Sequence, residues 1–219
     1  MQMLDACGRK IDYLRISITD RCNLRCVYCM PENGVSSISH DSLLRYEEIV
    51  RLVRLMQPLG VQKVRITGGE PMARRGCLEL VQNLHEMGGL SRIAMTTNAL
   101  LLRGRMREAR DKGLTSVNIS LDTLRPDVYA KITGRDSFDA VWRGLCAAVD
   151  AGLRVKINCV PLSGVNEDEL CSLAMLARDW PVDVRFIEMM PIGLGKAYQG
   201  SMQEVIQKNL ENIYGAAKP

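Results

Sequence analysis

The chain has 219 residues, of which 47% are hydrophobic and 25% charged, and its net charge is +4 at neutral pH. These fractions are ordinary for a globular protein and exclude a disordered or fibrous chain. Basic residues are spread along the chain without interleaved aromatic residues, so no nucleic-acid partner is indicated. We expect one domain over residues 1–219, since this length supports a single sizeable core.

The chain contains no apolar run of membrane-spanning length, and its N-terminus lacks the apolar core of a signal peptide. We therefore expect a cytoplasmic protein without a membrane partner. Thiols stay reduced in that compartment, so the eight cysteines are interpreted individually and not as disulfides. Five of them are scattered and resemble small buried core residues. These five are Cys7, Cys77, Cys146, Cys159 and Cys171.

Six short segments rich in β-branched residues recur along the chain and predict strands. They cover residues 13–19, 63–68, 92–97, 116–121, 154–160 and 182–189. Between them, apolar residues spaced about 3.6 apart predict helices. One of these, the charged run 103–112, is expected to expose its charged face and to turn Met106 and Ala109 inward.

Two helix starts carry a capping signal, in which a small polar residue is followed three positions later by glutamate. "NEDE" (166–169) is predicted to open the fifth helix in this way. The last helix is predicted to start at "SMQE", with Ser201 as the cap and Glu204 returning to it, and to end at Gly215.

Alternation of strands and helices predicts a parallel sheet with right-handed crossovers. Every second residue of the predicted strands is repeatedly polar. In an open doubly wound sheet, helices cover both faces, so the central strands would instead be nearly continuous apolar runs. The polar positions include Arg15, Arg65, Asn118, Lys156 and Asn158. The alternation therefore favours a full or partial barrel over an open doubly wound sheet, with the polar face lining a lumen that holds a ligand.

Three cysteines follow the first predicted strand in a C-x3-C-x2-C spacing. They are Cys22, Cys26 and Cys29. A structural zinc site needs a fourth protein ligand, and Cys7 is the only nearby thiol that could provide it, since neither histidine stands at a ligand spacing. A four-iron, four-sulfur cluster takes one cysteine per iron, so three would leave one iron open to a small molecule. The spacing favours this open iron over zinc or simple packing.

The loop, with Tyr28 before its last cysteine, resembles the signature of radical S-adenosylmethionine enzymes. Six stretches are similar, in order and wording, to the GTP 3′,8-cyclase family of molybdenum-cofactor biosynthesis. They are "YLRISITDRCNLRCVYCMP" (13–31), "RITGGEP" (65–71), "TTN" (96–98), "NISLD" (118–122), "VKIN" (155–158) and "FIEMMPIG" (186–193). The resemblance implies an α/β fold, a partial (β/α)6 barrel of the radical S-adenosylmethionine type.

The resemblance also implies the cofactors and their ligands. Cys22, Cys26 and Cys29 would hold one [4Fe-4S] cluster, and the open iron would bind the amino and carboxylate groups of S-adenosylmethionine. The other cofactor contacts it implies are Tyr28, Gly68, Gly69, Glu70, Ser120 and Met190. In "GGEP" the glycines let the backbone approach a ligand, and a carboxylate suits an ammonium group.

Four positions match the residues with which the family contacts GTP. They are Arg15, Arg65, Thr96 and Lys156. Cations that point into a lumen need a counter-charge, and a triphosphate would supply it. The alternative is ion pairing within the protein, with Glu70, Asp122 or Glu188.

The implied activity is that of a lyase. A reduced cluster would cleave S-adenosylmethionine, and the 5′-deoxyadenosyl radical would take the 3′ hydrogen of GTP, so that C3′ bonds to C8 of guanine. The product would be (8S)-3′,8-cyclo-7,8-dihydroguanosine 5′-triphosphate. A reductant protein would be the partner, and a homodimer is left open.

Two features depart from the family. Its C-terminal segment, with three cysteines that hold a second cluster and help to bind GTP, is not found in these 219 residues, so we expect turnover to be incomplete or uncoupled. Ala99 replaces the usual glycine and would be strained if its φ angle were positive. The alternatives are an enzyme with another substrate, such as a peptide, and a non-catalytic iron-sulfur-binding remnant.

Overall fold

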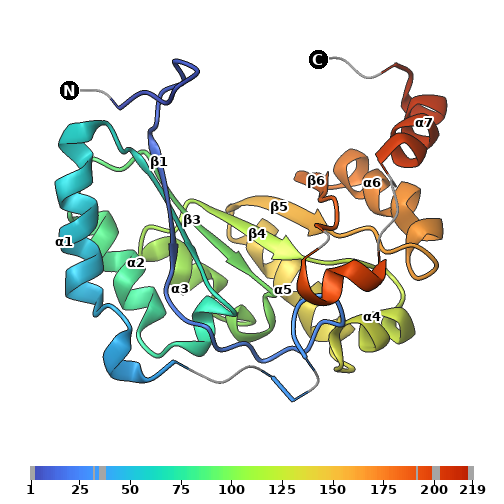
Figure 1. The fold of residues 1–219 in the computed structure, drawn as a ribbon, viewed down its shortest axis with the longest axis horizontal. Coiled ribbons are helices and arrows are strands. Elements are labelled where there is room, and N and C mark those ends of the chain that lie inside the picture. Colours follow the sequence, from blue (N-terminus) through green and yellow to red (C-terminus); the bar gives the residue numbers. More distant parts are fainter. Residues whose placement is uncertain (1–2, 32, 35–37, 191, 199–202, 217–219) are drawn as a thin grey trace.

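The computed structural model describes residues 3–31, 33–34, 38–190, 192–198 and 203–216. Six strands form one parallel sheet whose spatial order, β1 to β6, is the order in the chain (Figure 1). The strands are β1 (Tyr13–Ser17), β2 (Lys63–Thr67), β3 (Arg92–Thr97), β4 (Ser116–Ser120), β5 (Arg154–Cys159) and β6 (Val182–Phe186). All six predicted strands are confirmed, although five of them end before the predicted last residue.

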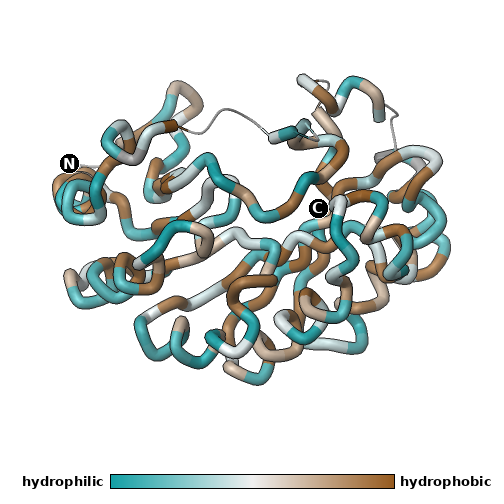
Figure 2. The backbone as a smooth tube through the Cα atoms, turned by 90° about the horizontal axis from the view of Figure 1, so that it is seen from below, coloured by the Kyte–Doolittle hydropathy of each residue, from teal (hydrophilic) through white to brown (hydrophobic). Residues whose placement is uncertain are grey.

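Sequential strand order places the helices on one side of the sheet, because every right-handed crossover advances in the same direction. The helices are α1 (Tyr46–Met56), α2 (Cys77–Glu86), α3 (Met106–Asp111), α4 (Pro126–Thr133), α5 (Phe138–Asp150), α6 (Leu170–Asp179) and α7 (Gln203–Tyr214). Seen at right angles to Figure 1, the backbone forms an arc with helices along its outer side (Figure 2). The fold is α/β, consistent with the predicted partial barrel.

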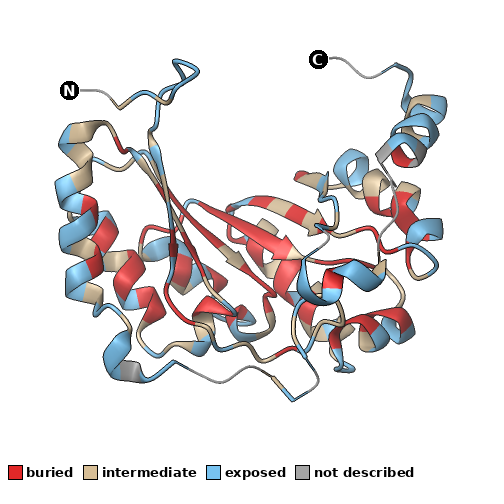
Figure 3. Ribbon diagram, viewed as in Figure 1, coloured by how far each residue is buried: buried red, intermediate tan, exposed pale blue. Residues whose placement is uncertain are grey.

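Side-chain parity places the core between the sheet and the helices. Ile66, Ile119 and Ile157 are fully buried there, and the outer sides of the helices are exposed (Figure 3). The opposite parity is the polar one, with Arg65 half-buried on β2 and Asn118 buried on β4. The predicted division into an apolar outer face and a polar inner face is therefore confirmed.

One predicted helix cap is wrong. Glu167–Glu169 form a short 3-10 turn before α6, and the side chain of Asn166 does not cap it. Asn166 Oδ1 instead accepts from the Leu162 N–H (2.7 Å), and the Glu169 carboxylate bonds the segment after β4. The Asn166 side chain thus bonds a more distant backbone amide in place of the amides at the helix start. The sequence pattern alone cannot show which of these two bonds forms.

The other helix predictions fare better. Met106 and Ala109 are the buried residues of α3, as predicted. Gly215, with a φ angle of +83°, follows the last residue of α7, also as predicted. Ser201 lies outside the described residues, and α4 was not predicted. In the described part of the chain, no helix is long and apolar enough to cross a membrane.

Candidate active site

The cysteine loop, residues 18–31, leaves the carboxyl end of β1 and passes beneath the other strand ends toward α4 (Figure 1). Within it, the amides of Cys29 and Met30 both donate to the Cys26 carbonyl, at 2.9 and 3.0 Å. This tight turn puts Cys26 and Cys29 on one bend of the chain. The Leu24 N–H points at Cys22 Sγ over 3.4 Å, a contact that favours a thiolate.

The three thiols are near enough to one another to interact electrostatically. Burial raises the pKa of Cys22, and the charge of Cys29 acts in the same direction. Burial raises the pKa of Cys26 to about 12, with further contributions from Asp122 and from the other two cysteines. Since a metal is bound by thiolates, occupation of this loop has to displace protons from Cys22 and Cys26.

"GGE" after β2 is packed against the backbone of the cysteine loop. Gly69 N–H donates to the Thr19 carbonyl (2.8 Å) and Glu70 N–H to the Arg21 carbonyl (2.7 Å). A Cβ on Gly69 would lie 2.3 Å from the Arg21 carbonyl oxygen. The glycines are thus required by the approach of this loop, a reason that the sequence did not reveal.

The carboxylate of Glu70 is buried and faces protein donors. It accepts from Met72 N–H (3.1 Å), Thr97 Oγ1 (2.8 Å) and Asn98 N–H (2.8 Å). Burial raises its pKa in spite of these hydrogen bonds. Glu70 therefore joins the loop after β2 to the loop after β3, and its contact with an ammonium group stays a prediction.

The polar face of the sheet surrounds a cavity of about 660 Å³. It is lined by Tyr13, Arg15, Arg65, Thr96, Asn118, Asn158, Arg185, Phe186 and Ile187. Arg65 is oriented by its neighbours, since it donates to the Tyr13 hydroxyl and reaches Thr96 Oγ1 over 3.4 Å. Three predicted GTP contacts, Arg15, Arg65 and Thr96, thus meet at one cavity.

Two features of this cavity point to a polar, anionic ligand. Among the described residues, no carboxylate lies within ion-pair distance of the three guanidinium groups that line it, so their counter-charge is left to a ligand. The Oδ1 atoms of Asn118 and Asn158 are buried without a hydrogen-bond partner. Arg185 was missed at the sequence level, although it has the polar parity of β6.

The remaining predicted site residues are less closely gathered. Lys156 sits beside Asn118 in the β4–β5 register, but its ammonium is paired with Asp183, a partner other than the three acids considered from the sequence. Ser120 ends β4 and is half-buried, whereas Met190 follows β6 and is exposed. Their contacts with S-adenosylmethionine stay predictions.

Tyr28 and Ala99 take up constrained positions. The Tyr28 hydroxyl donates to Asp122 Oδ2 (2.7 Å), and burial raises the pKa of Asp122 to about 6. Ala99 has a φ angle of +63° and is fully buried, so the strain expected for a non-glycine residue is present. Backbone in this left-handed region costs a non-glycine residue about 1 kcal/mol or more.

The donor set of the loop fits a cluster better than a single ion. Among the described residues, no group of three cysteine, histidine or acidic side chains is arranged to hold one metal ion. A cluster spreads its ligands, because each thiolate binds a different iron. Cys7 lies before β1 and the loop after it, so a strand of five residues separates them, about 16 Å at 3.3 Å per residue. Three mutually influencing thiols on one loop therefore match a cluster with an open iron.

Comparison with known proteins agrees with this geometry. The family model of the Radical SAM superfamily matches residues 16–177. A GTP 3′,8-cyclase of Pelotomaculum thermopropionicum is 51% identical over 197 residues, which are 90% of this chain and 61% of that protein. One of Clostridium botulinum is 44% identical over 96% of this chain and 68% of its own length. The chain thus spans about three fifths of some relatives and two thirds of others.

Solved structures share the fold at low sequence identity. Streptococcus suis SuiB, in its complex with the precursor peptide SuiA, superposes with a TM-score of 0.75 at 19% identity, over 92% of this chain and 45% of SuiB. Methylornithine synthase (PylB) has a TM-score of 0.71 at 21% identity, over 93% of this chain and 62% of its own. These likenesses bear on the architecture alone.

Proposed function

Because the chain belongs to the GTP 3′,8-cyclase family of the Radical SAM superfamily, we propose that it cleaves S-adenosylmethionine and directs the resulting radical to GTP. The observation that carries this proposal is the cavity in which Arg15, Arg65 and Arg185 meet without a carboxylate partner among the described residues. A nucleoside triphosphate supplies the negative charge that such a group of cations requires. The reaction is that of a lyase in molybdenum-cofactor biosynthesis, in the cytoplasm.

The two cofactors would be held by the loops at the strand ends. When bound, a [4Fe-4S] cluster supplies the electron that cleaves S-adenosylmethionine, and a reductant protein has to restore that electron. Cys22, Cys26 and Cys29 would hold the cluster; Tyr28, Gly69 and Ser120 would lie against S-adenosylmethionine. The protein's own contribution is to position both reactants and to keep water away from the radical.

The inner face would hold the nucleotide. Arg15 and Arg65 are neighbours in the β1–β2 register, so they can bind adjacent phosphate oxygens, and guanidinium groups do so with two parallel hydrogen bonds. Thr96, one strand further, offers a hydroxyl to the same ligand. The Lys156 ammonium would have to exchange Asp183 for a phosphate.

A turnover experiment tests the proposed function. Reduced, reconstituted protein is incubated with S-adenosylmethionine, with and without GTP deuterated at C3′. We expect 5′-deoxyadenosine, formed largely uncoupled from GTP. Deuterium transferred from GTP into it would establish GTP as the substrate. 5′-Deoxyadenosine with neither deuterium nor a cyclised nucleotide would mean an uncoupled core, and no 5′-deoxyadenosine at all would support the non-catalytic alternative.

Replacing Arg65 by alanine should weaken GTP binding at least about 10-fold, because a charged hydrogen bond in a partly buried site contributes about 1.5–3 kcal/mol. Binding of guanosine, which lacks the triphosphate, should change much less. Isothermal titration of both ligands measures the difference. Arg103→Ala is the matched control, since Arg103 is exposed and does not line the cavity. An equal loss for guanosine would contradict a phosphate contact.

A further inference from the structure

One hydrogen bond ties the middle of the cysteine loop to the end of β4, across 94 positions of the sequence. It runs from the Tyr28 hydroxyl to Asp122 Oδ2 over 2.7 Å. Tyr28 lies between Cys26 and Cys29, and its side chain packs against a small apolar cluster of Val128, Ile132 and Leu162. The position of this ring therefore determines where the second and third thiols stand.

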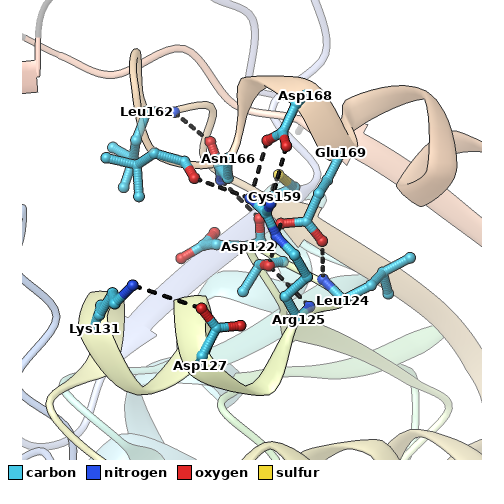
Figure 4. A network of polar contacts seen from close by, with 12 residues as sticks. Asp122, Leu124, Arg125, Asp127, Lys131, Cys159, Leu162, Asn166, Asp168 and Glu169 are labelled. Carbon is cyan, nitrogen blue, oxygen red and sulfur yellow. Dashed lines mark hydrogen bonds and ion pairs between the residues drawn. The ribbon is translucent and has the colours of Figure 1, made fainter.

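Asp122 is itself held rigidly. Its Oδ1 accepts from the Val160 N–H at the end of β5 (2.8 Å), so one carboxylate joins β5 to the cysteine loop. The Asp122 carbonyl accepts from Asn166 Nδ2 (2.7 Å), which also donates to the Val160 carbonyl (3.0 Å). Asn166 is completely buried, and this network lies between the ends of β4 and β5 (Figure 4).

A second set of polar contacts fixes the residues just beyond Asp122. Arg125 donates to Glu169 Oε1 (2.9 Å) and makes two hydrogen bonds to Asp168 (2.9 and 3.0 Å). Glu169 also accepts from the Leu124 N–H (2.9 Å). Figure 4 shows these side chains joining the segment before α4 to the turn before α6. The start of α4 cannot move without breaking them.

The far end of α4 receives the cysteine loop. The amides of Arg25 and Val27 donate to the carbonyls of Thr133 and Ile132, both at 2.9 Å. The last carbonyls of a helix lack partners within it, so they are ready acceptors. Residues 25–29 are thus attached by the backbone to α4 and by one side chain, Tyr28, to Asp122.

A buried carboxylate satisfied by neutral donors is a poor source of stability, because desolvation offsets much of what its hydrogen bonds contribute. Asp122 is 5% exposed, and its partners are a phenol and a peptide N–H. An apolar residue would fill the same space at lower cost. What the carboxylate provides is a fixed direction for the tyrosine hydroxyl.

We propose that Asp122 is a positioning residue of the cysteine loop: by holding the Tyr28 hydroxyl, it fixes Cys26 and Cys29 at the separation from Cys22 that the cluster requires. The inference rests on the proposed function, because cluster binding is part of that function. It adds a residue beyond those that touch a cofactor.

The test compares Tyr28→Phe, Asp122→Ala, the double variant and Asp122→Asn. Tyr28→Phe removes only the hydroxyl, and so keeps the ring and its packing. Asp127→Asn is the matched control, since Asp127 is an exposed carboxylate whose ion-pair partner among the described residues is Lys131, on the same helix. Thermal unfolding identifies any variant that fails to fold.

The first readout is the electron paramagnetic resonance spectrum of the reduced cluster, titrated with S-adenosylmethionine. Tyr28→Phe and Asp122→Ala should each raise the S-adenosylmethionine concentration at the midpoint of this titration about 10-fold. This is the effect of one lost hydrogen bond to a charged group. In the double variant, S-adenosylmethionine binding should be weakened no further than in the more affected single variant, because both changes remove the same hydrogen bond. Asp122→Asn, which retains polar partners for Val160 N–H and Tyr28, should resemble the wild type.

The second readout does not need the cluster. In apo protein, the rate of iodoacetamide alkylation at Cys26, followed by mass spectrometry, should rise about 10-fold in Tyr28→Phe and Asp122→Ala, because local opening becomes easier. Wild-type rates and spectra in Tyr28→Phe would overturn the inference. A wild-type chain that takes up no cluster would refute the proposed function, while the alkylation rates would still decide the role of Asp122.

Discussion

Cys26→Ser is expected to abolish cluster binding and with it the production of 5′-deoxyadenosine. Changes to residues that only orient a ligand reduce metal affinity about 10–100-fold, so loss of a ligand should exceed about 100-fold. A serine hydroxyl does not ionise near neutral pH and cannot replace the thiolate. Iron and sulfide content after anaerobic reconstitution, together with chromatographic detection of 5′-deoxyadenosine, measures the effect.

Cys7→Ser is the control, and it also separates two kinds of site. Cys7 is exposed and precedes β1, whereas the loop follows that strand. We expect its replacement to leave the iron content unchanged. If Cys7→Ser lost metal as completely as Cys26→Ser, a four-ligand site would replace the open-iron interpretation.

Gly69→Ala should unfold or displace the cysteine loop although it adds one methyl group. Its Cβ would lie 2.3 Å from the Arg21 carbonyl oxygen and 2.8 Å from that of Asp20, and both are backbone atoms that cannot turn aside. Overpacking of this kind costs about 1–3 kcal/mol, and contact with backbone puts the substitution at or above the upper end. Urea unfolding of the apo protein under reducing conditions measures the loss.

Gly164→Ala provides the comparison. Gly164 has a φ angle of +72°, but no atom lies within 4 Å of its added Cβ, so only backbone strain of about 1 kcal/mol is expected. The φ angle of Gly69 does not lie in the left-handed region, so Gly69→Ala carries no such strain, and the difference between the two variants is a lower limit on the steric effect at Gly69. Equal stability of both variants, with a full cluster in Gly69→Ala, would disprove the close approach of the two loops.

Much of the fold was predictable because it depends on local periodicity. Runs rich in β-branched residues identified all six strands, and the alternation of polar and apolar residues within them identified the face that lines the cavity. Arg15 and Arg65 were correctly expected to share this face, since the parity of each strand can be read from its own residues. The helix start at Asn166 was wrong, because a side chain that can cap a helix can also bond a distant backbone, and only the folded chain shows which bond forms.

The candidate site was predictable only in part. Cys22, Cys26 and Cys29 stand within one loop, so their spacing alone indicated a cluster. Arg185 has the right parity, but the sequence contains many arginines, and parity cannot tell which one reaches a cavity. Asp122 was considered only as an ion-pair partner of the inward-facing cations, and it instead bonds Tyr28.

By itself, then, the sequence determined the strand and helix pattern, the polar inner face and the three-thiol loop, because each depends on residues close together in the chain. The tertiary structure decided which loops meet: "GGE" against residues 19–21, Glu70 against the end of β3, and Tyr28 against Asp122. These contacts follow from strand order and register, which bring residues as many as 94 positions apart within hydrogen-bond distance. Local periodicity carries no information about such pairings.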